Sequence, residues 1–303
     1  MLKTTLKSNK KIAIGLAIVA ILLWSTVASV FKLGLRHYSP YQLVFLASIS
    51  SAIALLILSL IFNRKALVKG ISTKREFSLT LSQALLNPFL YYNTLLAGYK
   101  MLPAQIAQPI NFTWPIFLSV FAVLFIGEKF TRNRFLALII SFIGVVVVSA
   151  NGNFSGSENT SPSSGVILCL LSAVIWALYW ILNMRDARLP LVKLTWGFSI
   201  SVLCIWVYGL ITGNTMPKLE WPFLVYPVYI GLFEMSITFL IWITALEKAK
   251  NTVILSNMVY LIPVLSLGVI WVVLNESIKI TTVIGLTLIV CGVVIQSRLK
   301  QAR

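Results

Sequence analysis

The feature that most constrains this chain is a series of apolar runs, each long enough to cross a lipid bilayer. A hydrocarbon core about 30 Å thick needs roughly 20 helical residues, at about 1.5 Å per residue. The composition agrees: 58% of the 303 residues are hydrophobic and 11% are charged, whereas charged residues make up about 25% of soluble domains. We predict an all-α integral membrane protein with ten transmembrane helices, at residues 12–35, 41–62, 77–99, 103–126, 133–150, 164–184, 192–212, 223–246, 252–274 and 281–297.

The positive charge of the chain lies between these runs. A net charge of +17 in a soluble protein would suggest a nucleic-acid partner, but a distribution between apolar runs argues against one. With the N-terminus in the cytoplasm, 20 of the 25 lysine and arginine residues fall in cytoplasmic segments, in agreement with the positive-inside rule. The first run lacks a convincing cleavage site and is followed by more such runs. We predict a multi-pass protein of the bacterial inner membrane with both termini in the cytoplasm.

The second half of the chain repeats the pattern of the first. A shift of 148 positions places Pro115 over Pro263 and Glu128 over Glu276, which indicates an internal duplication. Five helices per copy is an odd number, so the second copy must enter the membrane from the opposite side. Inverted repeats are typical of secondary transporters, in which one central site opens alternately to the two sides. The predicted repeats span residues 12–150 and 164–297, joined by an external linker at 151–163.

The fourth span carries a polar stripe. Gln105, Gln108 and Asn111 follow one another at three-residue spacing, with Trp114 next, and the three amides share one helical face. An unpaired amide among lipid tails costs several kcal/mol, so this face must lie against protein or a water-filled cavity. Two interpretations stay open. The amides bind a polar substrate beside the Trp114 ring, or they hydrogen-bond to neighbouring helices.

Glu234 lies near the middle of the eighth span, with Thr238 and Trp242 on the same helical face. An ionisable side chain at that depth is costly and is a functional hypothesis by default. We predict that Glu234 is the counter-ion of a substrate amine or a protonation site. The alternative is a structural carboxyl group that is protonated or bonded to backbone amides.

Other polar and aromatic residues stand at helical spacing or midway along their spans. Together they would suffice to line a cavity, although helix packing explains most of them individually. The predicted lining adds Trp24, Asn87, Tyr91, Trp176, Tyr179, Asn257 and Tyr260.

Two symmetry-related pairs are predicted to have mechanical roles. Pro115 and Pro263 each remove a backbone hydrogen bond and are candidate hinges, unless they only shape the cavity. Glu128 and Glu276 close equivalent spans and are candidate gates or structural clamps. The helix dipole disfavours a carboxylate at a helix C-terminus. Each glutamate therefore needs a partner, such as a neighbouring lysine or the N-terminus of the following helix.

Several stretches match a known pattern: Leu23-Trp24-Ser25-Thr26, Asn111-Phe112-Thr113-Trp114-Pro115, Gly127-Glu128-Lys129, and Tyr260-Leu261-Ile262-Pro263 with Glu276. They resemble the EamA family of the drug/metabolite transporter superfamily. Within that family, Asn111 with Trp114-Pro115, and Ala173 with Trp176-Ala177 and Tyr179, look like the YddG-type amino-acid exporters. The resemblance covers nearly the whole chain and implies a transporter of small metabolites.

Nothing in the sequence suggests catalysis. The chain has no glycine-rich phosphate loop and no His/Cys/carboxylate cluster. We predict no enzyme and no cofactor, but a secondary transporter of small metabolites, with amino-acid or amine efflux as the leading hypothesis. Protons are a candidate coupling ion, and ten helices suffice for a complete monomer. The alternative is a non-transporting membrane receptor or scaffold that binds a small ligand in the same cavity.

Overall fold

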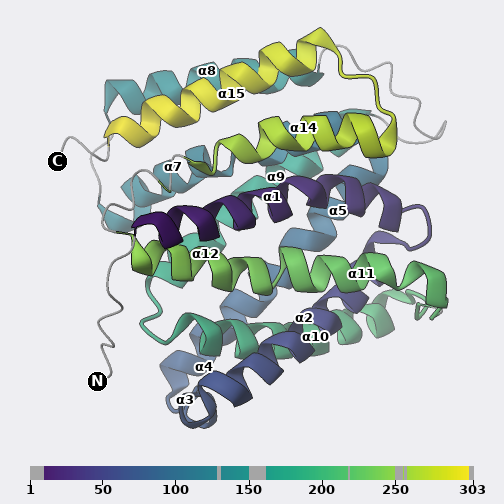
Figure 1. The fold of residues 1–303 in the computed structure, drawn as a ribbon, viewed down its shortest axis with the longest axis vertical. Helices are drawn as coiled ribbons and strands as arrows, with labels where there is room; N and C mark the ends of the chain where they lie inside the picture. Colours follow the sequence, from purple (N-terminus) through teal and green to yellow (C-terminus); the bar gives the residue numbers. More distant parts are fainter. Residues whose placement is uncertain are drawn as a thin grey trace.

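Apolar runs become helices because a helix satisfies its own backbone hydrogen bonds where no water is available. The computed structural model describes residues 10–127, 131–149, 162–217, 219–249, 255 and 258–299, and these residues include no strand. In chain order the elements (Figure 1) are α1 (Lys10–Gly34), α2 (Pro40–Phe62), α3 (Arg64–Val68), α4 (Lys74–Ala84), η1 (Leu85–Leu90), α5 (Tyr91–Met101), α6 (Ala104–Asn111), α7 (Trp114–Ile126), α8 (Arg132–Ser149), α9 (Pro162–Met184), α10 (Pro190–Thr212), η2 (Trp221–Phe223), α11 (Val225–Tyr229), η3 (Ile230–Glu234), α12 (Ile237–Lys248), α14 (Leu261–Leu274) and α15 (Ile280–Leu299).

Many of these helices have the length and composition of membrane spans. Six described segments are long and apolar enough to cross a membrane: Lys11–Gly34, Pro40–Phe62, Ala104–Ile126, Ser163–Met184, Pro190–Thr212 and Trp221–Lys248. Three shorter apolar helices are Phe135–Ser149, Leu261–Leu274 and Ile280–Ile295. The all-helical, multi-pass character expected from the sequence is confirmed. The number of ten spans stays a prediction.

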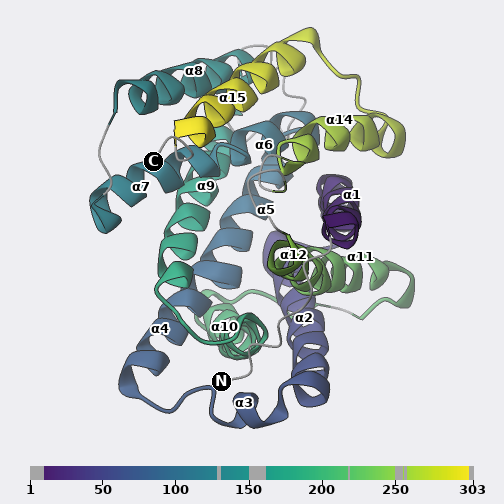
Figure 2. The same ribbon diagram turned by 60° about the vertical axis from the view of Figure 1, so that its left-hand side comes forward.

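The helices lie side by side in layers (Figures 1 and 2). The α8–α15 pair forms one edge of the bundle, and α2, α10 and the short α3 and α4 form the opposite edge. Helices α1, α5 and α9 lie between these edges. Helix α1 begins and α15 ends at the same end of the bundle (Figure 1).

The helix contacts made by the first half of the chain have equivalent contacts in the second half. Helix α1 packs on α12 and α14, whereas α9 packs on α5 and α7. The pairs α2–α10 and α8–α15 each join one helix from either half. Swapping the first-half elements for their second-half counterparts leaves this pattern of neighbours unchanged.

Glycines set the close approach of α8 and α15. A Cβ atom added at Gly144 would lie 2.7 Å from the carbonyl oxygen of Gly285, and one added at Gly285 would lie 2.6 Å from that of Gly144. Small residues allow helix backbones to approach closely inside a bilayer, where dispersion contacts drive association. The two glycines therefore act as a reciprocal contact.

Replacement of Gly285 by Ala is expected to lower the stability of the protein by about 1–3 kcal/mol, because the added methyl group overpacks the α8–α15 contact. The measurement is thermal unfolding in detergent. The control is Gly268→Ala in α14, where an added Cβ meets no atom within 4 Å. The stability of this variant should stay equal or rise slightly, because alanine has a higher helix propensity than glycine. Equal melting temperatures for the two variants would contradict the close-contact account.

Candidate functional site

A cavity of about 140 Å³ lies in the interior of the bundle, between the two halves of the chain. Helices α1, α5, α6 and α7 contribute from the first half, and α9, η3, α12 and α14 contribute from the second. Aromatic rings supply most of the wall. The described lining residues are Trp24, Val27, Phe31, Tyr91, Leu95, Tyr99, Gln108, Asn111, Phe112, Trp114, Trp176, Trp180, Glu234, Phe239, Trp242, Val259 and Ile262. We call this space the central cavity.

Broken helices surround the central cavity. Asn87 interrupts the third span with extended dihedral angles, φ −142° and ψ 123°, directly before Pro88. A proline cannot donate a backbone hydrogen bond and drives the preceding residue out of the helical region. The fourth span breaks between α6 and α7, and the eighth span breaks at Ser236, with φ −135° and ψ −75°.

Hydroxyl groups satisfy the carbonyls at two of these breaks. Ser236 Oγ donates to Gly231 O at 2.6 Å, and Thr113 Oγ1 donates to Ile110 O at 2.7 Å. A broken helix is tolerated at membrane depth only when its backbone groups find such partners or face a cavity.

Glu234 places its carboxylate at the central cavity. It is the last residue of η3, and its Oε1 accepts a hydrogen bond of 3.0 Å from Tyr92 Oη. No lysine, arginine or histidine in the described part of the chain forms an ion pair with it. The cavity therefore contains an acidic group with a hydroxyl donor but without a described cationic partner.

Tyrosine hydroxyls bind the amides of α6. Tyr99 Oη donates to Gln108 Oε1 at 2.5 Å, and Tyr91 Oη donates to Asn111 Oδ1 at 3.3 Å. Asn111 Nδ2 donates in turn to Ser172 Oγ of α9 at 2.9 Å. Both amides line the cavity, and Asn111 also links the first half of the chain to the second.

The aromatic rings of the wall form one connected set of contacts. Trp24 packs edge-on against Phe239, with centroids 5.4 Å apart, and lies 5.8 Å from Trp242. Phe239 lies 6.0 Å from Trp176, which stacks on Tyr91 at 4.5 Å. The Trp180 ring lies edge-on to Trp176 at 6.0 Å, and its buried Nε1 has no hydrogen-bond partner among the described residues.

The structure brings together eight of the residues proposed from the sequence. Those that line the central cavity are Trp24, Tyr91, Gln108, Asn111, Trp114, Trp176, Glu234 and Trp242. Asn87, Gln105, Tyr179, Thr238 and Tyr260 do not belong to the described lining. Asn257 and Glu128 lie outside the described residues.

Two of the excluded residues are held in contacts that the sequence spacing did not reveal. Gln105 is buried at the N-terminal end of α6, where its Nε2 donates to Ser277 O at 2.8 Å. Thr238 follows the break at Ser236, and its hydroxyl donates to the carbonyl of Phe233. A regular helix would place Thr238 beside Glu234, but the break changes the helical phase.

The remaining excluded residues support the wall or its helices. Tyr179 stacks on Trp176 at 5.2 Å, and Asn87 is buried at the break of the third span. Tyr260 packs partly buried against the hydrophobic core, one turn before Pro263 in α14. Pro115 lies in the first turn of α7, at the break in the fourth span.

Glu276 holds the N-terminus of α6. Its two carboxylate oxygens accept hydrogen bonds from Ala104 N at 3.0 Å and Gln105 N at 3.1 Å. A negative charge is favourable at a helix N-terminus, where backbone N–H groups are unsatisfied. The sequence suggested that a neighbouring lysine or the following helix compensates Glu276. The structure adds a partner that the sequence did not indicate, the first turn of α6, in the other half of the chain. We call this contact the Glu276 clamp.

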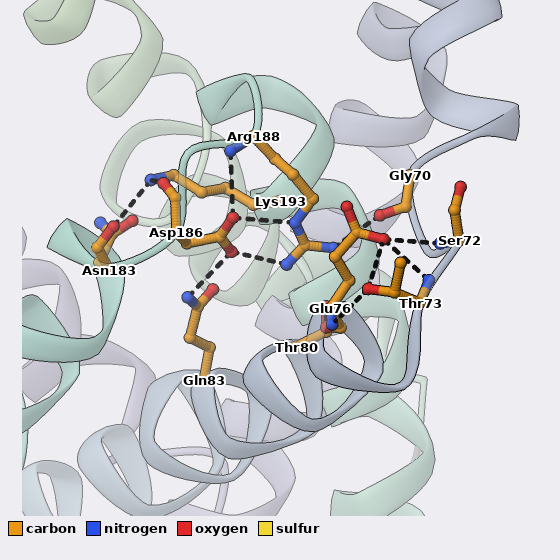
Figure 3. Close-up of polar contacts among 10 residues, drawn as sticks. All are labelled: Gly70, Ser72, Thr73, Glu76, Thr80, Gln83, Asn183, Asp186, Arg188 and Lys193. Atoms are coloured by element: carbon orange, nitrogen blue, oxygen red, sulfur yellow. Dashed lines mark hydrogen bonds and ion pairs between the residues drawn. The ribbon is translucent and has the colours of Figure 1, made fainter.

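A second polar contact lies at the opposite end of the bundle (Figures 1 and 3). Asp186, in the α9–α10 loop, accepts hydrogen bonds from Arg188 Nη2 at 2.6 Å, Arg188 Nε at 2.9 Å and Gln83 Nε2 at 3.1 Å. Arg188 Nη1 also donates to Gly70 O at 2.7 Å, and Lys193 Nζ donates to Asp186 O at 3.2 Å. This Asp186 cluster joins the second half of the chain to α4 and the α3–α4 loop.

The pKa of Asp186 reflects two opposing effects, burial of the carboxyl group and its interactions with Arg188 and Gln83. Burial acts to raise the pKa of the carboxyl group, but the hydrogen bonds and charge of Arg188, with the Gln83 amide, outweigh burial and hold the pKa below its usual value. Neither Asp186 nor Arg188 was among the site residues predicted from the sequence. An acidic residue in an otherwise basic loop is the signal that would have pointed to Asp186.

A capping box holds the adjacent start of α4 (Figure 3). Glu76 Oε2 accepts hydrogen bonds from Ser72 N and Thr73 N, each at 2.9 Å, and Thr73 Oγ1 accepts from Glu76 N at 3.1 Å. The Ser72 amide and the Thr73 hydroxyl lower the pKa of Glu76. Capping of this kind fixes where α4 begins, and so positions Gln83 for its bond to Asp186.

Comparison with known proteins adds a family to this geometry. The EamA-like transporter family matches the chain twice, at residues 11–150 and 163–298. The uncharacterized transporter YvbV of Bacillus subtilis is 26% identical over 288 residues, covering 93% of this chain and 90% of its own length. A probable terminal-alkyne amino-acid exporter of Streptantibioticus cattleyicolor is 24% identical over 300 residues, covering 94% and 93%.

One solved crystal structure shares the fold. It superposes with a TM-score of 0.65 and covers 96% of this chain and 98% of its own, at 21% sequence identity. Identity at that level shows a likeness of fold alone.

Proposed function

Because the chain belongs to the EamA-like transporter family, whose relatives are named transporters and not enzymes, we propose that it is a secondary transporter of small amino-acid or amine metabolites. The central cavity is the proposed binding site, and efflux is the proposed direction. One relative is named a probable amino-acid exporter, which supports this substrate class and direction. Glu234 is the proposed counter-ion for the substrate amine or the site at which a coupling proton binds.

The observation that carries this proposal is the position of the cavity between two contacts at opposite ends of the bundle. The Glu276 clamp and the Asp186 cluster each join one half of the chain to the other. Opening of one contact while the other stays closed would expose the cavity to one side only. Alternating access requires such a pair of gates around a fixed site.

We propose ten spans, arranged as two inverted repeats at residues 12–150 and 164–297 with an external linker at 151–163. The two separate family matches coincide closely with these halves, and the exchangeable helix packing supports a symmetric pair. Helices α1 and α15 have their outer termini at the same end of the bundle, as expected for an even number of crossings. The basic loops support a cytoplasmic location for this end, in the bacterial inner membrane.

Two cysteine variants test this topology. In a chain without Cys169, Cys204 and Cys291, a thiol introduced by Asn214→Cys is expected to react with an impermeant maleimide added outside intact cells. One introduced by Ser72→Cys should react only after the membrane is opened. Both positions are exposed in the structure, so accessibility reports the side of the membrane. Labelling of both variants in intact cells would contradict the proposed orientation.

Transport itself is tested by solute counterflow. Purified protein in proteoliposomes is loaded with one of a panel of amino acids and amines, and uptake of the same labelled solute is followed with and without a pH gradient. A transporter accelerates labelled uptake when unlabelled solute is inside. Saturable binding without any exchange would favour the alternative, a receptor or scaffold. Stimulation by the pH gradient would support proton coupling.

A further inference from the structure

The described lining of the central cavity contains an acidic side chain and no basic one. Among its described lining residues, Glu234 is the one side chain that can carry a full charge near neutral pH, and none is Lys, Arg or His. Lys32, on the cavity-lining helix α1, is not part of the lining. Its Nζ donates to Tyr99 O at 2.9 Å and Leu102 O at 3.0 Å. A bound zwitterion would therefore find a partner for its ammonium group but no cation for its carboxylate.

The neutral donors of the cavity do not replace that cation. The Gln108 and Asn111 carbonyls already accept hydrogen bonds from tyrosine hydroxyls, and Asn111 Nδ2 donates to Ser172. The other donors of the described lining, Gln108 Nε2, the second N–H of Asn111 Nδ2 and Trp180 Nε1, are neutral and bring no positive charge to balance a carboxylate. A carboxylate placed in this largely aromatic cavity beside Glu234 would lose much of its hydration and meet a like charge.

The walls suit a cation with an apolar body. Ten of the 17 lining residues are aromatic, and ring faces attract an ammonium group through their quadrupoles. The volume, about 140 Å³, is close to that of an engineered cavity of about 150 Å³ in another protein that binds benzene. A single ring or a short alkyl chain therefore fills the space.

From these three observations we infer that the central cavity takes a small monoamine without a carboxylate, in preference to the corresponding amino acid. This inference rests on the proposed function, since it names the substrate class of the same site. Glu234 neutralises the ammonium group, and the tryptophan walls enclose the apolar body. The zwitterionic amino acid is the competing ligand class, and matched pairs of ligands separate the two.

The test compares phenethylamine with phenylalanine, and tyramine with tyrosine, as ligands of the purified full-length protein. Each pair differs only by the carboxylate. Competition against labelled phenethylamine is expected to give an affinity at least about tenfold higher for each amine than for its amino acid. Equal or tighter binding of the amino acids would overturn the inference, and so would the absence of binding by both amines.

Variants locate the effect at Glu234. Glu234→Gln should weaken phenethylamine binding at least about tenfold and remove the preference over phenylalanine. Glu220→Gln, in an exposed segment that is not part of the cavity, is the matched control and should leave both affinities unchanged. If Glu234→Gln does not fold, the inference is tested by the wild-type affinity ratios of each amine to its amino acid. An unchanged preference in a folded Glu234→Gln variant would overturn the assignment.

Failure of this inference is distinguishable from failure of the proposed function. Counterflow of phenylalanine without binding of phenethylamine would reject the monoamine class and retain the transporter. Binding of phenethylamine without counterflow of any tested solute would retain the monoamine class and reject transport.

Discussion

Glu234→Gln is expected to reduce the exchange of the transported solute at least about tenfold. Glutamine keeps the size of the side chain and an oxygen that can accept the 3.0 Å hydrogen bond from Tyr92 Oη, but it removes the charge and the titratable group. Loss of about 1.4 kcal/mol of substrate binding already corresponds to a tenfold change. The same substitution removes the carboxyl group that would bind a coupling proton.

The measurement is the initial rate of counterflow in proteoliposomes at equal protein density. Glu220→Gln is the control, because it removes one acidic group from an exposed position away from the cavity. Its rate should match the wild type. Wild-type rate, affinity and pH dependence in the Glu234→Gln variant would show that the carboxylate is structural.

Arg188→Met is expected to destabilise the protein by about 1–3 kcal/mol. The substitution leaves the Asp186 carboxylate, which is 7% exposed, without the ion pair and the two side-chain hydrogen bonds that Arg188 donates from Nε and Nη2. Removing one partner of a buried pair costs more than removing both, because the remaining charge keeps its desolvation cost. Thermal unfolding in detergent measures the change.

The double variant Asp186→Asn/Arg188→Met provides the control for this prediction. It should be more stable than Arg188→Met alone, since no uncompensated carboxylate remains. The Asp186 pKa lies below its usual value of about 3.9, so the cluster should stabilise the protein fully above that pH and lose its effect as the pH falls through the lower folded-state pKa. A double variant less stable than the single one would contradict this account.

The sequence was a good guide to residue types and a poor guide to helix phase. Glu234, Asn111 and the mid-span tryptophans stood out because polar and aromatic groups at that depth need partners or a cavity, and the structure places them around one space. Gln105 and Thr238 were grouped with them by regular helical spacing. Gln105 shares the unbroken helix α6 with Gln108 and Asn111, but its amide is held by Ser277. The break at Ser236 changes the helical phase between Glu234 and Thr238 inside a single apolar run, and no proline stands beside that break.

Contacts between residues far apart in the chain were the second feature that the sequence did not reveal. The sequence indicated that Glu276 needs compensation, because a carboxylate is unfavourable at a helix C-terminus. Its partner, the first turn of α6, is more than 170 positions away in the chain. The link from Gln83 to Asp186 spans 103 positions. Contacts of this kind depend on how the two halves of the chain pack, and no local pattern encodes that packing.

The central claim is that one cavity opens alternately to the two sides, and thiol reactivity at Asn111 tests it most directly. Asn111 lines the cavity. In a chain without native cysteines, the Asn111→Cys variant is treated with an impermeant thiol reagent from either side of oriented vesicles. We predict that weakening the Asp186 cluster and weakening the Glu276 clamp change the thiol reactivity from the two sides in opposite directions. Asp186→Asn/Arg188→Met should raise reactivity from the cytoplasmic side and lower it from outside, and Glu276→Ala should do the reverse. Reactivity that rises from both sides together in either variant would contradict alternating access.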